Sequence, residues 1–161
     1  MGSLFCFSNM KTLIQKQHLA VSHNIAWHYF STPRNLNEIT PPDMRFSIKS
    51  ALPDTMHEGL LIEYKIKLWN VVPLNWITEI THIKQQHYFV DEQRKGPFRI
   101  WHHEHWFQAA ENNTVIMTDV LHYAIGKSIA GYLAGELFVH REVANIFRHR
   151  KLVLEKKFGV V

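Results

Sequence analysis

Two histidines in one short stretch are the residues of this sequence best placed to do chemistry. Residues 98–109 read FRIWHHEHWFQA, and in an extended strand every second side chain shares a face. One face would then carry Trp101, His103, His105 and Phe107. Because imidazole titrates near neutral pH, hydrogen-bonds and ligates metals, this face could orient a ligand, transfer protons or bind a metal ion.

The stretch at residues 114–124 carries a carboxylate in a matching phase. Alternation places Asp119 on one face together with four apolar or aromatic side chains, those of Val115, Met117, Leu121 and Tyr123. We expect both faces to point inward, which sets the two imidazoles about 7 Å apart along their strand. Asp119 could then lie across the ladder from one of them. Because buried polar groups need partners, the histidines must bond to Asp119, to water or to a ligand.

The sequence leaves three roles open for these groups. They could form a structural hydrogen-bond network, or lie exposed on the outer face of a sheet. They could hold the polar end of an otherwise apolar ligand. They could also act in acid–base catalysis, with His103 or His105 paired to Asp119, or bind a metal through the same groups. We predict no metal and no cofactor, because alternating strand histidines are common without a metal ion and the sequence shows no outer groups that would orient metal ligands.

The composition predicts one globular domain that positions these residues. The chain has 161 residues, 46% of them hydrophobic and 20% charged, and we expect a single domain over residues 11–159 behind a flexible tail at residues 1–10. The net charge of +4 is too small to predict nucleic-acid binding. The single cysteine, Cys6, excludes an internal disulfide and fits a reducing compartment, so we expect a cytoplasmic protein. No apolar run approaches the ~20 residues of a membrane span, and no stable membrane insertion is expected.

Hydrophobic periodicity and turn residues predict the elements of that domain. The turns between strands are too short for a parallel crossover, which predicts an antiparallel sheet. A long helix with Leu137, Phe147 and Leu154 on its apolar stripe closes the chain, and Gly159 is placed to end it in the left-handed conformation. The class is therefore α+β, and one helix cannot cover a whole concave sheet face, so we expect a cavity. The predicted strands are residues 11–21, 44–50, 60–69, 74–85, 87–91, 98–109 and 114–124, and the predicted helices are residues 23–30, 34–39 and about 128–158.

Six strings follow one another along nearly the whole chain. They are PRNLNEITP at 33–41, FVDEQ at 89–93, GPF at 96–98, WHHEHWF at 101–107, DVLHY at 119–123 and IFRHR at 146–150. Their order and spacing resemble the helix-grip superfamily of START lipid-transfer domains, the birch pollen allergen and polyketide cyclases (SRPBCC proteins), and above all its small bacterial branch, whose members are often labelled polyketide cyclase/dehydrase-like. The resemblance implies a seven-stranded curved antiparallel sheet around a long C-terminal helix, two short helices between strands 1 and 2, and an apolar ligand cavity. It implies no reaction, because the superfamily mixes carriers, receptors, chaperone regulators and a few enzymes.

Other residues complete the predicted site and its surroundings. Tyr64 and Trp76 lie on the apolar faces of their strands, and we predict that they line the cavity. The loop at residues 124–134 could gate its mouth. Two polar sets are expected to be solvated: the turn formed by Asp91, Glu92, Arg94 and Lys95, and the outer face of the closing helix with Arg141, Arg148, Arg150, Lys151, Lys156 and Lys157.

The first functional hypothesis is a non-catalytic intracellular carrier or sensor for a hydrophobic or amphipathic small molecule, such as a lipid, an isoprenoid or a polyketide-like compound. The alternative is a cyclase- or dehydratase-type enzyme of the same fold that uses His103 or His105 with Asp119. A protein-interaction role of the basic helix is a third hypothesis. The sequence sets neither the ligand nor the oligomeric state. The predicted ligand-binding residues are Tyr64, Trp76, Trp101, His103, His105, Phe107, Met117, Asp119 and Tyr123.

Overall fold

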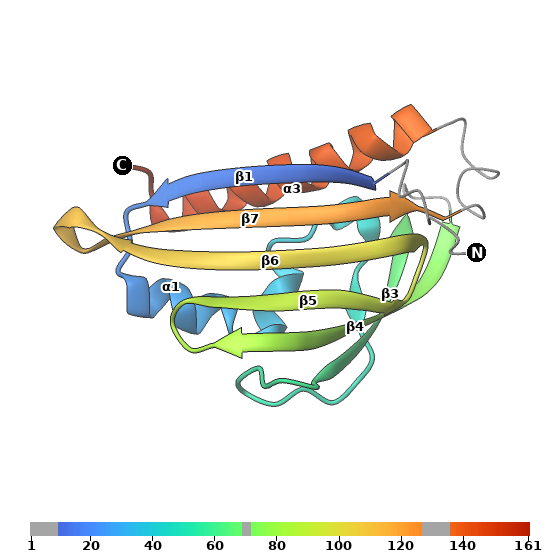
Figure 1. Cartoon of the computed structure of the whole chain (residues 1–161), viewed down its shortest axis with the longest axis horizontal. Coiled ribbons are helices and arrows are strands. Elements are labelled where there is room, and N and C mark those ends of the chain that lie inside the picture. The colour runs from blue at the N-terminus through green and yellow to red at the C-terminus, as the bar shows by residue number, and fades with distance from the viewer. Residues whose placement is uncertain (1–9, 69–71, 127–135) are drawn as a thin grey trace, which may run out of the picture.

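A computed structural model describes residues 10–68, 72–126 and 136–161 of the chain. Within these ranges seven strands form one sheet, and a long helix closes the chain (Figure 1). The strands are β1 (Met10–Leu19), β2 (Ser47–Ile48), β3 (Leu61–Leu68), β4 (Val72–Lys84), β5 (Tyr88–Lys95), β6 (Phe98–Ala110) and β7 (Thr114–Ile125). The α-helices are α1 (His23–Phe30) and α3 (Glu136–Phe158), and the 3-10 helices are η1 (Pro33–Asn37), η2 (Pro42–Met44) and η3 (Glu111–Asn113). The predicted α+β class is confirmed.

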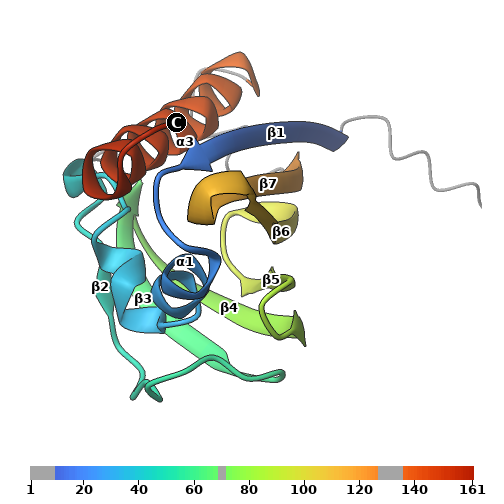
Figure 2. The same ribbon diagram turned by 90° about the vertical axis from the view of Figure 1, so that its left-hand side faces the viewer.

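The sheet has the strand order β1-β7-β6-β5-β4-β3-β2, and all neighbouring strands are antiparallel. Strands β2 to β7 form the predicted meander, and β1 pairs with β7. Figure 2 shows the sheet strongly curled, with α3 lying across its open side and α1 within the curve. The concave face therefore meets both helices, and the core lies between them.

Aromatic side chains fix α1 against the concave face. Ser22 caps this helix, since its side chain accepts a hydrogen bond from the Ile25 amide at 3.4 Å. The rings of Trp27 and Phe30 then pack on Phe107 of β6, with centroids 5.5 and 5.2 Å away. Phe107 is thereby covered by α1 and lies in the core.

The inner face of α3 carries one buried stripe with spacings of four and three residues. Its members are Val139, Val143, Phe147, Arg150 and Leu154. Leu137, which the sequence placed on this stripe, is 83% exposed, so that prediction is wrong. The predicted end of the helix is confirmed, because Gly159 has φ +77° and its amide donates to the Glu155 carbonyl at 2.9 Å.

Two glutamines of β1 attach α3 to the edge of the sheet. The amide of Gln15 donates to the carbonyl of Phe147 at 3.1 Å, and that of Gln17 to the carbonyl of Lys151 at 3.2 Å. These bonds join the strand to the two residues that flank the turn carrying Arg150. They therefore help to fix the position of Arg150 relative to the sheet.

Some predicted bounds differ from the structure. The strand predicted at residues 87–91 continues to Lys95, so the solvated turn predicted at residues 91–95 is wrong. The strand predicted at residues 44–50 shrinks to two residues. Two predicted segments lie outside the described residues. They are residues 1–9 of the predicted tail, and residues 127–135, which include most of the predicted gating loop and the predicted start of the closing helix. Among the helices that the structure describes, none has the length and apolar character to cross a membrane.

Candidate functional site

The histidine face of β6 points to the concave side, as predicted. His103 and His105 are each 3% exposed, whereas Trp106 on the other face is 42% exposed. His102 and Glu104 share that outer face and bond to each other at 3.2 Å. The alternation of the strand thus separates two buried imidazoles from a polar outer surface.

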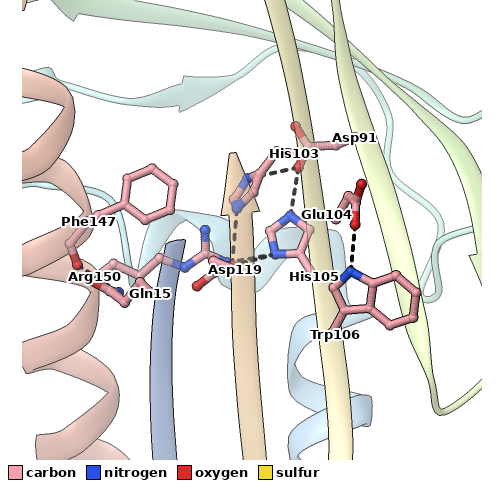
Figure 3. A network of polar contacts seen from close by, with 9 residues as sticks. All are labelled: Gln15, Asp91, His103, Glu104, His105, Trp106, Asp119, Phe147 and Arg150. Carbon is pink, nitrogen blue, oxygen red and sulfur yellow. Dashed lines mark hydrogen bonds and ion pairs between the residues drawn. The ribbon is translucent and has the colours of Figure 1, made fainter. Parts of the chain in front are cut away.

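Strand register brings a carboxylate to each buried histidine. Asp91 of β5 pairs with His103, and Asp119 of β7 pairs with His105. Figure 3 shows the four side chains arranged as a closed ring, in which each imidazole lies between the two carboxylates. We call Asp91, His103, His105 and Asp119 the Asp–His ring.

Four nitrogen–oxygen contacts close the Asp–His ring. Oδ2 of Asp91 lies 3.3 Å from Nδ1 of His103 and 2.7 Å from Nε2 of His105. Oδ1 of Asp119 lies 3.1 Å from Nε2 of His103 and 3.0 Å from Nδ1 of His105. Both nitrogens of both imidazoles are therefore in contact with a carboxylate.

Arg150 of α3 is the fifth charged member of the site. Its Nη2 lies 3.3 Å from Nδ1 of His105 and 3.9 Å from Oδ1 of Asp119. Aromatic rings cover the rest, because Phe89 stacks on His105 with centroids 4.1 Å apart and Phe147 lies edge-on to His103 at 5.2 Å. Bulk water is therefore largely excluded from the charged groups, which strengthens their mutual interactions.

The two histidines differ in their affinity for a proton. Burial alone would lower the pKa of His103, but hydrogen bonds to Asp119 and Asp91 outweigh it and raise that pKa above its ordinary value. Burial and the positive charge of His103 together lower the pKa of His105. Of the two imidazoles, His103 therefore holds a proton more readily than His105.

Both carboxylates are ionised in this setting. Burial would raise the pKa of Asp119, but Arg150 and the hydrogen bonds from the histidines hold it well below its ordinary value. Hydrogen bonds from His103 and His105 likewise outweigh burial and lower the pKa of Asp91. Two carboxylates, one imidazolium and one guanidinium make the buried group electrically neutral, as a desolvated cluster requires.

Counting donors assigns the hydrogens. Protonated His103 donates to both Asp91 and Asp119. His105 donates through Nε2 to Asp91, and its Nδ1 accepts from Arg150, which has only donors. One contact then lacks a hydrogen, because Nδ1 of His105 and Oδ1 of Asp119 face each other at 3.0 Å as two acceptors.

A pocket opens beside the Asp–His ring, between the concave face and α3. Its wall is mainly apolar and aromatic, and its volume is about 150 Å³. Asp91, His103, His105 and Arg150 contribute to one part of this wall. Tyr64, Trp76 and Trp101 line it as well, and Tyr64 hydrogen-bonds to Thr78. The pocket thus combines a mainly apolar wall with one charged region.

Two residues that line the pocket each have a buried N–H group with no partner among the described residues. These groups are Nε of Arg150 and Nε1 of Trp76. An unpaired buried donor costs roughly 1–3 kcal/mol, so each is a position where an acceptor would be stabilising. Both residues therefore point to a molecule that supplies oxygen atoms.

The structure divides the predicted site residues into three groups. Tyr64, Trp76, Trp101, His103 and His105 line the pocket. Asp119 does not line it, but contacts both histidines from β7. Three others are buried in the core and are not part of the pocket wall, namely Phe107, Met117 and Tyr123.

Two site residues were predicted to be solvated, and both predictions are wrong. Asp91 lies within β5, where it follows Phe89 on the concave face, and it contacts both imidazoles. Arg150 is 8% exposed and occupies a position of the inner stripe of α3. The available signals were the alternation of Phe89 with Asp91, and the four-three-four spacing of Val143, Phe147, Arg150 and Leu154.

No family model matches the sequence, and no curated protein matches it. Solved structures do match. A START superfamily protein from Mycobacterium smegmatis superposes with a TM-score of 0.69 at 9% identity, covering 91% of this chain and 96% of that chain. Norcoclaurine synthase from Thalictrum flavum, solved with dopamine and hydroxybenzaldehyde, gives 0.58 at 13% identity, covering 91% of this chain and 87% of that chain. The di-domain ARO/CYC protein BexL from the BE-7585A biosynthetic pathway gives 0.63 at 13% identity, covering 91% of this chain and 45% of that chain.

These similarities show the fold. The chain has the helix-grip fold of START-type (SRPBCC) proteins, in which a curved antiparallel sheet holds a C-terminal helix. The predicted fold is confirmed. Identities of 9–13% transfer neither a ligand nor a reaction, because one fold serves many functions.

Proposed function

We propose that this chain binds an amphipathic small molecule in the pocket between the sheet and α3. The apolar part of the molecule would lie against Trp76 and its neighbours, and an oxygen-bearing end would lie against Arg150. The observation that carries this proposal is that Arg150 lines the pocket and that its buried Nε has no partner among the described residues.

The donor groups of Arg150 favour a carboxylate or a polarised carbonyl at the bound end. Arg150 presents planar donors that match two oxygen atoms of a carboxylate. Its other contacts, to His105 and Asp119, are long at 3.3 and 3.9 Å, so they leave capacity for a stronger acceptor. A second acceptor on the same molecule could reach Nε1 of Trp76.

The volume of the pocket favours a compact ligand. About 150 Å³ is comparable to a protein cavity that holds a single aromatic ring. A molecule with one or two rings, or a short acyl chain, fits this space better than a long-chain lipid. Norcoclaurine synthase, of the same fold, was solved with the small aromatic molecules dopamine and hydroxybenzaldehyde. Among the predicted ligand classes, this supports a polyketide-like compound.

A matched pair of probes tests the proposal. Titration calorimetry with 2-naphthoate and with 2-naphthalenemethanol compares a carboxylate with a neutral alcohol on one apolar body. We expect the carboxylate to bind at least tenfold more tightly, and Arg150→Gln to remove that preference. Arg148→Gln is the control, because Arg148 is exposed and, within the described part of the chain, donates to Asn145.

Blocking the pocket provides the second arm of the test. Ile66 is 3% exposed and lines the pocket, so Ile66→Phe should fill it from β3. Both probes should then lose affinity while the circular dichroism spectrum stays unchanged. Equal affinity of both probes for the wild type, or binding that survives Ile66→Phe, would reject the proposal.

Acid–base catalysis of the cyclase or dehydratase type is the second candidate. A buried imidazole with a lowered pKa, such as His105, is a common feature of catalytic sites. However, both ring nitrogens of each histidine contact a carboxylate of the protein, so neither ring offers a free nitrogen to a bound molecule. This geometry favours binding over catalysis by His103 or His105.

A further inference from the structure

The Asp–His ring has four nitrogen–carboxylate contacts but too few hydrogens to fill them. Each contact at 2.7–3.3 Å is stabilising only with a proton or another cation between the two atoms. Four protons would require both imidazoles to be charged. With one neutral imidazole, Nδ1 of His105 and Oδ1 of Asp119 face each other as two acceptors at 3.0 Å, and the donor beside them is Arg150, whose Nη2 lies 3.3 and 3.9 Å away.

Protonating the second imidazole would supply the missing hydrogen of the Asp–His ring, but it is electrostatically unfavourable. The two imidazole centroids are only 3.8 Å apart, and both rings are buried. Two positive charges at that distance repel strongly in a medium that excludes water. Arg150 adds a third positive charge beside His105. Protonation of both histidines is therefore unfavourable. With only one histidine protonated, Nδ1 of His105 and Oδ1 of Asp119 remain in contact as two acceptors.

We propose that Asp91, His103 and His105 bind one divalent transition-metal ion. The ion replaces two protons, one at Nδ1 of His103 and one at Nε2 of His105, which are the two nitrogens that face Oδ2 of Asp91. Two neutral imidazoles and one dication carry the same total charge as two imidazoliums. The repulsion between the rings is thereby removed, and the buried group, with two carboxylates and Arg150, then carries a net charge of +1.

The positions of the donor atoms agree with a common centre. An ion with bonds of about 2.0–2.2 Å to nitrogen and oxygen holds adjacent ligand atoms roughly 3 Å apart. The Asp91 oxygen is 2.7 and 3.3 Å from the two nitrogens, and the three ligand atoms lie within 4.8 Å of one another. Small rotations of the side chains would bring all three to bonding distance.

Asp119 completes this arrangement from the opposite side of both rings. Its Oδ1 is 3.1 Å from Nε2 of His103 and 3.0 Å from Nδ1 of His105, the two nitrogens that point away from Asp91. In the metal-bound state both nitrogens carry hydrogens and donate to Asp119. A carboxylate that accepts from the far nitrogen of a metal-bound histidine fixes its tautomer and orientation. The acceptor pair of the metal-free state disappears, and Nδ1 of His105 no longer accepts from Arg150.

The remaining coordination positions would face the pocket. Asp91, His103 and His105 all line it, whereas Asp119 stays behind the rings. Two imidazoles and one carboxylate with open positions suit Zn²⁺, Co²⁺ or Fe²⁺, and not Mg²⁺ or Ca²⁺, which prefer oxygen ligands. The inference is independent of the proposed organic ligand, because the ion binds groups that all belong to the chain.

Calorimetry with Zn²⁺ on purified, chelator-treated protein tests the site without any organic probe. We expect one ion per chain. Zn²⁺ binding should weaken as the pH is lowered, because protons compete with the ion for the two imidazole nitrogens. Co²⁺ should give visible absorption bands that Zn²⁺ abolishes. A failure of naphthoate binding would leave these results unaffected.

Variants separate the buried site from the outer face of the sheet. Asp91→Asn should weaken Zn²⁺ binding at least 100-fold, and Asp119→Asn should weaken it about 10–100-fold without removing a ligand. His102→Asn is the control, because His102 lies between Glu92 and Glu104 on the outer face and could bind a metal adventitiously. Binding that survives Asp91→Asn but is lost in His102→Asn would overturn the proposal, as would no binding to the wild type. If Asp91→Asn does not fold, His105→Gln provides the same comparison.

Discussion

The imidazole rings of His103 and His105 lie with their centroids 3.8 Å apart at an angle of 46°, and both contact the same two carboxylates. Protonation of one ring therefore disfavours protonation of the other. The pair titrates as a unit, and substitutions within the Asp–His ring will not have additive effects.

The first prediction concerns the pH dependence of stability in the metal-free protein. His103, which faces Asp91, Asp119 and His105, has a raised pKa, so the stability it contributes is full below its unfolded pKa near 6.5 and is lost as pH rises through its folded pKa. His105 has a lowered pKa, so its contribution grows as pH rises towards 6.5. Their combined contribution should therefore be greatest near pH 6.5.

Urea unfolding between pH 5 and 9 measures this dependence. Each histidine can contribute a slope of at most about 1.4 kcal/mol per pH unit. His103→Gln should flatten the decline above pH 6.5. A free energy of unfolding that keeps rising from pH 6.5 to 8 in the wild type, or the same decline in His103→Gln, would contradict the assigned charge of His103.

The second prediction concerns Asp119, which is 1% exposed. Asp119→Asn keeps the shape of the side chain but removes the charge that balances His103 and Arg150. Leaving buried charges without a counterion typically costs about 3–5 kcal/mol, so we expect a loss of that size in the free energy of unfolding. Glu104→Gln is the matched control on the outer face, and it should change stability by less than about 0.5 kcal/mol. Equal losses in the two variants would show that Asp119 is not electrostatically important.

Much of the fold and part of the site follow from local patterns. Alternation divided β6 into two faces, and the matching phase of β7 favoured the histidine face as the inner one. The same phase placed Asp119 across from a histidine, as the register confirms. These predictions succeed because a strand exposes its period of two directly in the sequence. Gly159 was readable for a similar reason, since a left-handed residue at a helix end favours glycine.

The burial of Asp91 and Arg150 could not be predicted from local patterns in the same way. Both are charged residues within polar stretches, and a local pattern assigns such residues to the surface. Their burial depends on partners in other strands and on the two β1 glutamines that seat α3. Phe107 was predicted to line the pocket because it alternates with the histidines, whereas in the structure its ring packs against Trp27 and Phe30 of α1. Only the tertiary arrangement distinguishes core from pocket on one sheet face.

The third prediction concerns the attachment of α3 to β1. Gln15→Met keeps the side-chain length but removes the hydrogen bond to the Phe147 carbonyl. We expect a loss of about 1 kcal/mol in the free energy of unfolding, the usual worth of one such bond. Amide hydrogen exchange should become faster in α3 but not in β3. Unchanged exchange in α3 would show that packing of the inner stripe alone holds the helix.

The last prediction compares two buried tryptophans. Trp27 and Trp76 are each 6% exposed, but Nε1 of Trp27 donates to Gln85 at 3.1 Å whereas Nε1 of Trp76 has no partner among the described residues. Substitution by Phe removes a similar apolar area at both positions. It also removes a hydrogen bond at Trp27 and an unpaired donor at Trp76, so Trp27→Phe should be more destabilising by about 1–2 kcal/mol.

If Nε1 of Trp76 instead binds an acceptor of the ligand, Trp76→Phe should weaken 2-naphthoate binding only modestly but remove any preference for probes with a second carbonyl group. Urea unfolding of both variants with and without a dicarbonyl probe measures the two effects, and equal losses of stability in the probe-free proteins would show that the Trp76 donor is satisfied in solution.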